Sequence, residues 1–140
     1  MIAILVRHAE RLSSGNDPGL SAAGKRRALL LAKMFGGAGV SAIFTSTFRR
    51  TKETAAPLAA KTGLTPAVIA DDIAHARTEI LSSGPCVVIV GHSDTVPALV
   101  RALGGPSGIV IGAEEFDRMF VVSVAAPGPT SVLQIRYVSS

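Results

Sequence analysis

Short apolar runs alternate with amphipathic segments along the chain. Residues 1–6 and 86–90 are apolar and rich in β-branched side chains, which predicts two buried strands. Between Ala28 and Phe35, apolar side chains recur at the i, i+3, i+4 and i+7 spacing of a helix with one apolar face. We therefore expect a helix that begins after an N-cap at Ser21 and ends near Phe35.

The remaining segments continue this alternation. We expect strands at 40–45, 67–70, 119–125 and 132–138, and helices at 48–62, 71–82 and from Ser93 or Asp94 to Leu103. The turn residues 127–130 join the last two strands and indicate an antiparallel hairpin. This order predicts one α/β domain over residues 1–140: a three-layer αβα sandwich, mostly parallel, with an antiparallel C-terminal hairpin or edge.

Composition restricts the class of protein further. The chain has 140 residues, 48% hydrophobic and 17% charged, which is typical of a globular protein. No apolar run approaches the ~20 residues of a membrane helix, and the opening apolar run is short and has no basic segment before it. We therefore expect no membrane partner and a cytoplasmic location, unless an export signal has been cut away. The single cysteine, Cys86, excludes an internal disulfide and is expected to be a small buried hydrophobe.

The net charge of +4 raises the question of a nucleic-acid partner. The chain has no Trp and one Tyr with which to stack bases, and its basic residues form two short clusters. These clusters are 25–27 and Arg49, Arg50 and Lys52. We interpret the first as a solvated helix face, and we expect no nucleic-acid partner.

Three predicted strand ends carry the candidate chemistry. Ligands of open α/β sheets bind beyond the carboxyl ends of the strands. Arg7 and His8 follow the first strand, residues 46–50 follow the second, and residues 91–93 with His92 follow the strand at 86–90. A single histidine there would most simply be structural, but two histidines with arginines favour a site.

These residue types suit phosphoryl transfer. An arginine presents a planar fork of donors that matches phosphate oxygens. A neutral imidazole is a nucleophile that can form a covalent intermediate, and neighbouring cations disfavour its protonation. A helix beginning at Ser93 or Asp94 adds backbone N–H groups. Such a site stabilises a transferring phosphoryl group without a metal or other cofactor.

Four segments in order resemble the histidine phosphatase superfamily, also called phosphoglycerate mutase-like. LVRHAE at 5–10 resembles the signature of that family. DPGLSAAG at 17–24 is similar to its D-x-x-L-[ST]-x-x-G pattern, and TSTFRRTKETA at 45–55 is similar to its S-x-x-x-R-x-x-x-T-A pattern. VGHSDTVP at 90–97 resembles its second histidine motif. The resemblance extends from about residue 2 to residue 103 and is closest to short phosphohistidine phosphatases.

The resemblance implies roles for individual residues. His8 would accept the phosphoryl group, and Arg7 would bind the phosphate beside it. His92 would bind the substrate and stabilise the transferring group. Ser93 would offer its backbone N–H to the phosphate, or would simply cap the helix.

The second phosphate-binding arginine must be chosen between two neighbours. Arg50, four residues after Ser46, fits the spacing of the motif. Arg49 would point about 100° away on a helix, so only one of the two can face the pocket squarely. We also expect Gly24 to serve close packing, and consider Ser14 and Asn16 as substrate contacts.

The resemblance leaves the general acid without an assignment. The family usually has a carboxylate shortly after the third strand, which here falls near His75 with Asp71, Asp72 and Glu79 around it. We interpret Glu79 as an exposed helix residue and Asp71 or Asp72 as a helix cap or first-turn charge. A missing acid matters least for a phosphoramidate, which favours a phosphohistidine substrate.

The function hypothesis is a metal-independent phosphatase that forms a covalent phosphohistidine on His8. Its substrate would be a phosphorylated small molecule or a phosphoprotein. The short stretch between Arg50 and His92 has no room for a lid, which predicts an open, shallow crevice and disfavours a mutase. Two alternatives are a non-catalytic phosphate- or partner-binding module, and a hydrolytic metal held by His8 and His92. The oligomeric state is not predicted.

Overall fold

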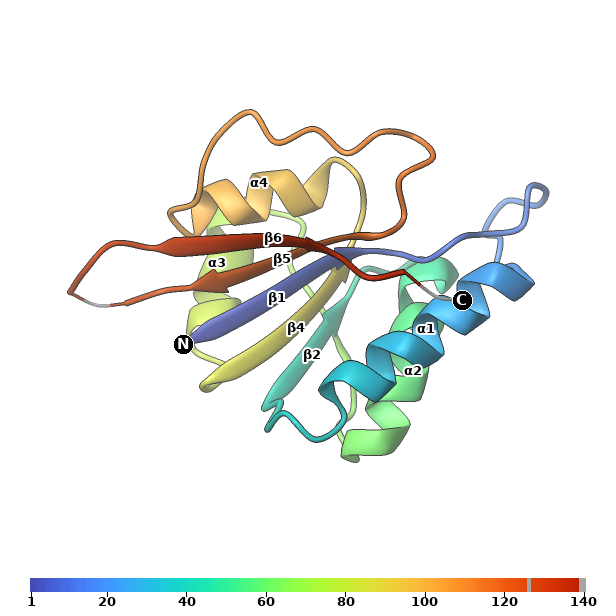
Figure 1. Ribbon diagram of the computed structural model, residues 1–140, viewed down its shortest axis with the longest axis horizontal. Coiled ribbons are helices and arrows are strands. Elements are labelled where there is room, and N and C mark those ends of the chain that lie inside the picture. The colour runs from blue at the N-terminus through green and yellow to red at the C-terminus, as the bar shows by residue number, and fades with distance from the viewer. Residues whose placement is uncertain (126, 139–140) are drawn as a thin grey trace.

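The computed structural model describes residues 1–125 and 127–138, and in these residues a six-stranded sheet lies between four helices (Figure 1). Of the predicted domain 1–140, residues 126 and 139–140 lie outside the described residues. The elements are β1 (Ile2–Arg7), α1 (Ala22–Phe35), β2 (Ala42–Thr45), α2 (Arg49–Thr62), β3 (Ala67–Val68), α3 (Ile73–Leu81), β4 (Cys86–Gly91), α4 (Thr95–Ala102), β5 (Arg118–Ser123) and β6 (Ser131–Arg136).

The sheet has the order β3-β2-β4-β1-β5-β6. The first four strands of this order are parallel, whereas β5 runs antiparallel to both β1 and β6. The predicted fold class is therefore confirmed, including the C-terminal hairpin. The connection of the hairpin is longer than expected, because β5 ends at Ser123 and β6 begins at Ser131; part of it, residue 126, lies outside the described residues.

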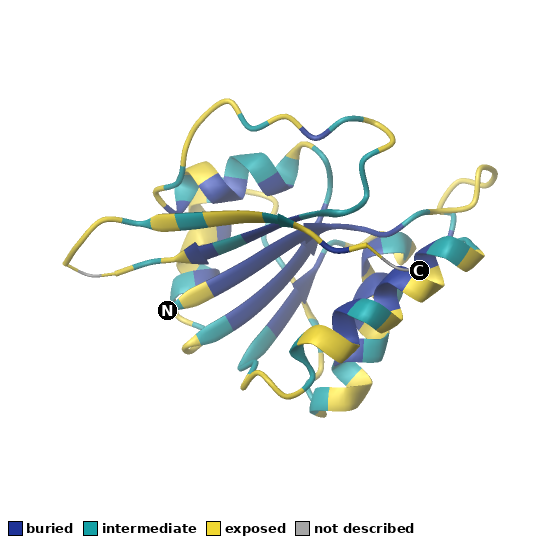
Figure 2. Ribbon diagram, viewed as in Figure 1, coloured by how far each residue is buried: buried dark blue, intermediate teal, exposed yellow. Residues whose placement is uncertain are grey.

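Alternating side chains of the central strands form two cores, one on each face of the sheet. Ala3 and Leu5 of β1 pack in the core beneath α3 and α4, while Ile4 and Val6 pack in the core beneath α1 and α2. The central strands are buried along most of their length (Figure 2). Both faces being covered explains why these strands are apolar at nearly every position.

Capping side chains set the helix starts. Ser21 accepts the Gly24 N–H, as expected for an N-cap. At α4, Asp94 caps the helix by accepting the Thr95 N–H, which resolves the choice between Ser93 and Asp94. Asp72, not Asp71, caps α3 by accepting the His75 N–H. No helix in the described part of the chain is long and apolar enough to cross a membrane.

The basic cluster at 25–27 is only partly a solvated face. Lys25 and Arg26 are exposed, but Arg27 is buried and forms an ion pair with Glu10, Nε to Oε1, at 2.9 Å. Arg27 also donates to the carbonyl of Tyr137. The sequence pattern did not reveal this pair, because the partner carboxylate lies in the loop after β1. Cys86 is half-buried.

Gly24 lies where α1 crosses the loop after β1. A Cβ atom at this position would overlap the carbonyl oxygen of Glu10, whose backbone also accepts the Ser21 N–H at 2.9 Å. The glycine therefore permits a close approach of two backbones, in agreement with the packing role expected for it.

We expect Gly24→Ala to lower the free energy of unfolding by about 1–3 kcal/mol, because the backbone it meets cannot move aside cheaply. Gly37→Ala is the matched control, since a Cβ there meets nothing within 4 Å. Urea denaturation of both variants checks this. Equal stability of the two would contradict the close-packing role.

Candidate active site

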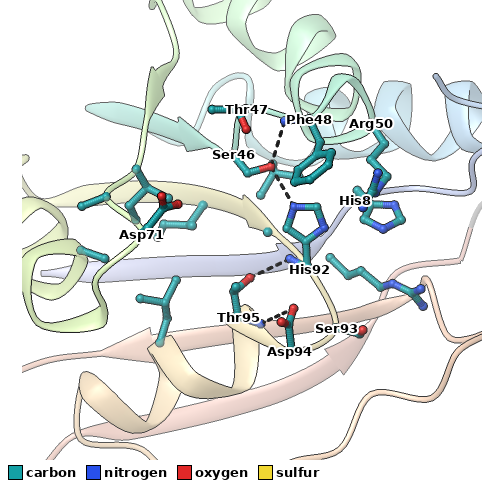
Figure 3. A pocket seen from close by; sticks show the side chains of 18 of the residues that line it. His8, Ser46, Thr47, Phe48, Arg50, Asp71, His92, Ser93, Asp94 and Thr95 are labelled. Atoms are coloured by element: carbon teal, nitrogen blue, oxygen red, sulfur yellow. Dashed lines mark hydrogen bonds between the residues drawn. The ribbon is translucent and has the colours of Figure 1, made fainter. Parts of the chain in front are cut away.

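The carboxyl ends of β1, β2 and β4 meet at one pocket with a volume of about 460 Å³ (Figure 3). The parallel pairing of β1 with β4 places Arg7 opposite Gly91, and the His8 N–H donates to the Gly91 carbonyl at 2.8 Å. The pocket lining includes all five residues expected from the sequence, namely Arg7, His8, Arg50, His92 and Ser93.

His8 is buried, with 3% of its surface exposed. Its Nδ1 lies 2.8 Å from the carbonyl oxygen of Ala9, which only accepts hydrogen bonds, so Nδ1 carries the proton. The Ala9 N–H in turn donates to the Thr54 hydroxyl at 2.9 Å, which fixes the backbone after His8. In the neutral ring, the lone pair is therefore on Nε2.

The surroundings of His8 keep it neutral. Burial lowers the pKa of the imidazole to about 4, and the cations Arg7 and Arg50 act in the same direction, against the Ala9 hydrogen bond. At neutral pH the ring is therefore uncharged, with its one proton on Nδ1. Its free nitrogen is available as a nucleophile.

His92 faces His8, with ring centroids 5.4 Å apart. Its Nε2 lies 2.8 Å from the Ser46 hydroxyl oxygen, and its backbone N–H donates to the Thr95 hydroxyl (Figure 3). Burial and the charge of Arg50 lower the pKa of His92. Ser46 belongs to a motif that was recognised in the sequence, but its contact with His92 could not be predicted from that motif.

Arg7 is anchored on one side and unpartnered on the other. Its Nη1 donates to three backbone carbonyls of residues 112–115, and its guanidinium carbon lies 4.1 Å above the centre of the Phe116 ring. Its buried Nε has no acceptor among the described residues. A buried donor without a partner is costly, so this nitrogen lowers the stability of the folded protein unless an acceptor reaches it.

Arg50 and Arg49 point to different places. Arg50 lines the pocket, its guanidinium lies 4.4 Å from the centre of the Phe48 ring, and its buried Nε also has no acceptor among the described residues. Arg49 is 62% exposed and pairs with Glu53 at 2.8 Å. The structure thus brings Arg50, and not Arg49, to the histidines.

The loop after His8 contributes Arg11 to the pocket. Ser14 and Asn16, considered as substrate contacts, are exposed and do not line it. In Figure 1 this loop projects from the body of the protein between β1 and α1. Arg11 adds a third cation to the lining of the pocket, besides Arg7 and Arg50, and the family motifs did not identify it.

The four acid candidates near β3 have different positions. Asp71 is exposed and lines the pocket, on the side away from His8 (Figure 3). Asp72 caps α3 and pairs with His75, which is 81% exposed; neither lines the pocket. Glu79 is half-buried rather than exposed, because its carboxylate accepts the Ala70 N–H at 2.8 Å. A second carboxylate at the pocket, Asp94, belongs to the α4 cap.

The side of the pocket near Asp71 is apolar. Ile69, Ile73 and Leu99 line it, supplied by the segment after β3, by α3 and by α4. The pocket therefore has a cationic end that fits an oxyanion and an apolar end that fits an uncharged group attached to it. In the described residues, no group of three His, Cys, Asp or Glu side chains is placed to hold a metal ion.

A fold and a site of this kind define the class of protein. The family model of the histidine phosphatase superfamily (branch 1) matches residues 3–76, more than half of the chain. The chain belongs to this superfamily, and membership supports a phosphatase. A search of curated proteins found no match.

Solved structures share the fold. The protein histidine phosphatase SixA, solved with tungstate, superposes with a TM-score of 0.79 at 17% identity over 97% of both chains. The α-ribazole phosphatase from Shigella flexneri gives 0.75 at 14% identity, covering 98% of this chain and 96% of its own. A mycobacterial glucosyl-3-phosphoglycerate phosphatase, solved with inorganic phosphate, gives 0.68 at 18% identity, covering 99% and 97%.

We expect the imidazole of His8 to titrate with a pKa of about 4 in the free protein. The ring then stays neutral at every pH above that value, instead of gaining a proton near the ordinary value of ~6.5. NMR titration of the ring carbon resonances, assigned with His8→Ala, measures this. A midpoint at the ordinary value would contradict a buried neutral nucleophile.

Proposed function

We propose that this protein is a metal-independent phosphatase that forms a covalent phosphohistidine on His8. One observation carries the proposal: the neutral, buried Nε2 of His8 lies in a pocket where two arginines have buried Nε groups without an acceptor among the described residues. Structures of the same fold were solved with tungstate and with inorganic phosphate, which supports an oxyanion as the occupant.

The reaction has two displacements at phosphorus. First, the Nε2 lone pair of His8 attacks phosphorus, the N–P bond forms, and the bond to the leaving group breaks with its electron pair. Then water attacks the phosphohistidine, the P–N bond breaks, and inorganic phosphate leaves. The hydrogen bond from Nδ1 to Ala9 stabilises the ring as positive charge develops during the first attack.

The cationic groups stabilise the equatorial oxygens. Arg7 and Arg50 supply directed N–H groups, and Ser93 at the pocket supplies its backbone N–H. The Ser46 hydroxyl lies 2.8 Å from Nε2 of His92. In the tautomer in which Ser46 donates to Nε2, the ring proton is on Nδ1, and His92 can donate it to the phosphoryl group. None of these contributions requires a metal ion.

The leaving group occupies the apolar side of the pocket in this proposal. The carboxylates there are poorly suited to protonating it, because Asp71 is exposed and Asp94 already accepts the Thr95 N–H. Aryl oxides leave without much help, and the imidazole of a phosphohistidine takes a proton from solvent at its distal nitrogen. We therefore favour phosphohistidine and aryl-like phosphate substrates over alkyl phosphates.

The second candidate is a phosphate- or partner-binding module without turnover. It is favoured by the exposure of Asp71 and Asp94, the two carboxylates that line the pocket among the described residues. Turnover of a substrate that needs no proton donor separates the two. The cytoplasmic location expected from the sequence stays a prediction.

We expect hydrolysis of an aryl phosphate that continues undiminished in EDTA. His8→Ala should abolish both turnover and covalent labelling by a ³²P-labelled substrate, because the attacking nitrogen is lost. Arg49→Ala is the matched control and should retain both, since this side chain lies outside the pocket. Undiminished activity of the His8→Ala variant would contradict the assignment of His8 as the nucleophile. Loss of activity in EDTA that a metal ion restores would favour a hydrolytic metal held by His8 and His92. Phosphate binding without turnover would favour the non-catalytic binding module.

We expect kcat/KM for an alkyl phosphate to be roughly 10²-fold or more below that for an aryl phosphate or a phosphohistidine peptide, which is the size of a missing general acid. Steady-state assays of the three substrates measure this. Similar values for all three would show that a proton donor is present. Asp71→Asn and Asp94→Asn would then identify which carboxylate supplies it.

A further inference from the structure

The anchoring of Arg7 depends on a segment far away in the sequence. Its Nη1 donates to the carbonyl oxygens of Gly112, Ala113 and Glu115 at 3.1, 3.0 and 2.9 Å. All three acceptors surround this one nitrogen, which has two hydrogens, so one hydrogen is shared between two carbonyls. The three carbonyls therefore hold this end of the guanidinium in place.

The carbonyls form this cage because the segment turns sharply. Residues 112–115 belong to neither a helix nor a strand. The Glu115 N–H donates to the Gly112 carbonyl at 3.0 Å, and the Glu115 carboxylate accepts the Gly112 N–H at 2.9 Å. The side chain of Glu115 thus closes the turn that its own backbone begins.

The same carboxylate attaches the turn to the edge of the sheet. Oε2 of Glu115 pairs with Arg136 of β6 at 3.0 Å, and Oε1 lies 3.5 Å from Arg118 of β5. Arg136 also pairs with Asp117 at 2.9 Å. Asp117 and Glu115 therefore both pair with Arg136. Unlike Glu115, Asp117 has no hydrogen bond to Gly112 among the described residues.

We propose that Glu115 is a positioning residue for phosphate binding. It closes residues 112–115 into a carbonyl cage, fastens the cage to the C-terminal hairpin, and so holds the Arg7 guanidinium in place at the pocket. Glu115 acts through the backbone, since the atoms that touch Arg7 are carbonyl oxygens. The proposal rests on the proposed function only in taking a phosphate group as the ligand.

The test is the affinity of the full chain for inorganic phosphate. This affinity is measured by NMR titration of the ring resonances in the pocket, a method that detects weak binding and requires no turnover. We expect Glu115→Ala to weaken phosphate binding about 10- to 100-fold, the effect of misplacing an oriented group. Glu115→Gln keeps an acceptor for the Gly112 N–H and should recover part of the loss. Asp117→Ala, which removes the other carboxylate on Arg136, should bind phosphate as the wild type does.

A double-mutant cycle separates positioning from a general structural effect. Once Arg7 is removed there is nothing for the cage to hold, so Glu115→Ala should cost almost no further affinity in an Arg7→Ala background. Full additivity, or wild-type affinity of Glu115→Ala, would overturn the proposal. If Glu115→Ala does not fold, the same cycle with Glu115→Gln decides. A wild type that binds phosphate but hydrolyses nothing would overturn the proposed catalysis and leave this test intact.

Discussion

The parallel pairing of β1 with β4 is the constraint on which the site depends. It places Arg7 opposite Gly91 and ties the His8 N–H to the Gly91 carbonyl, so the two histidines leave the sheet from adjacent strands. Both strands are buried on two faces, and a shift in register would move apolar side chains from one core to the other. The packing of both cores therefore fixes the strand register, and with it the distance between His8 and His92.

A second constraint is the balance of charge around His8. Arg7 and Arg50 lie near His8, and the imidazole of His8 is also buried away from water. Both effects oppose a proton on the ring, which keeps the nitrogen nucleophilic. Burial also leaves the Nε groups of Arg7 and Arg50 without acceptors among the described residues, which lowers the stability of the folded protein.

Much of this arrangement could be predicted from the sequence, because it follows from local patterns. The apolar runs predicted the central strands, and the rule for strand ends predicted that Arg7, His8 and His92 lie together. Motif spacing selected Arg50 over Arg49. The parts that escaped prediction are contacts between distant segments: Arg27 with Glu10, Glu79 with the Ala70 N–H, and Arg7 with residues 112–115. Residues 112–115 have no hydrophobic periodicity and no motif, so the local sequence does not indicate that they contact Arg7.

The link between Arg7 and the C-terminal hairpin has a consequence for the order in which the protein is made. Every family motif lies in the first three quarters of the chain, yet the cage around Arg7 is fastened by Arg118 and Arg136. Arg7, His8, Arg50 and His92 all precede β6 in the chain. They are therefore synthesised before the hairpin that fastens the cage, and the cage can close only when the edge strands join the sheet.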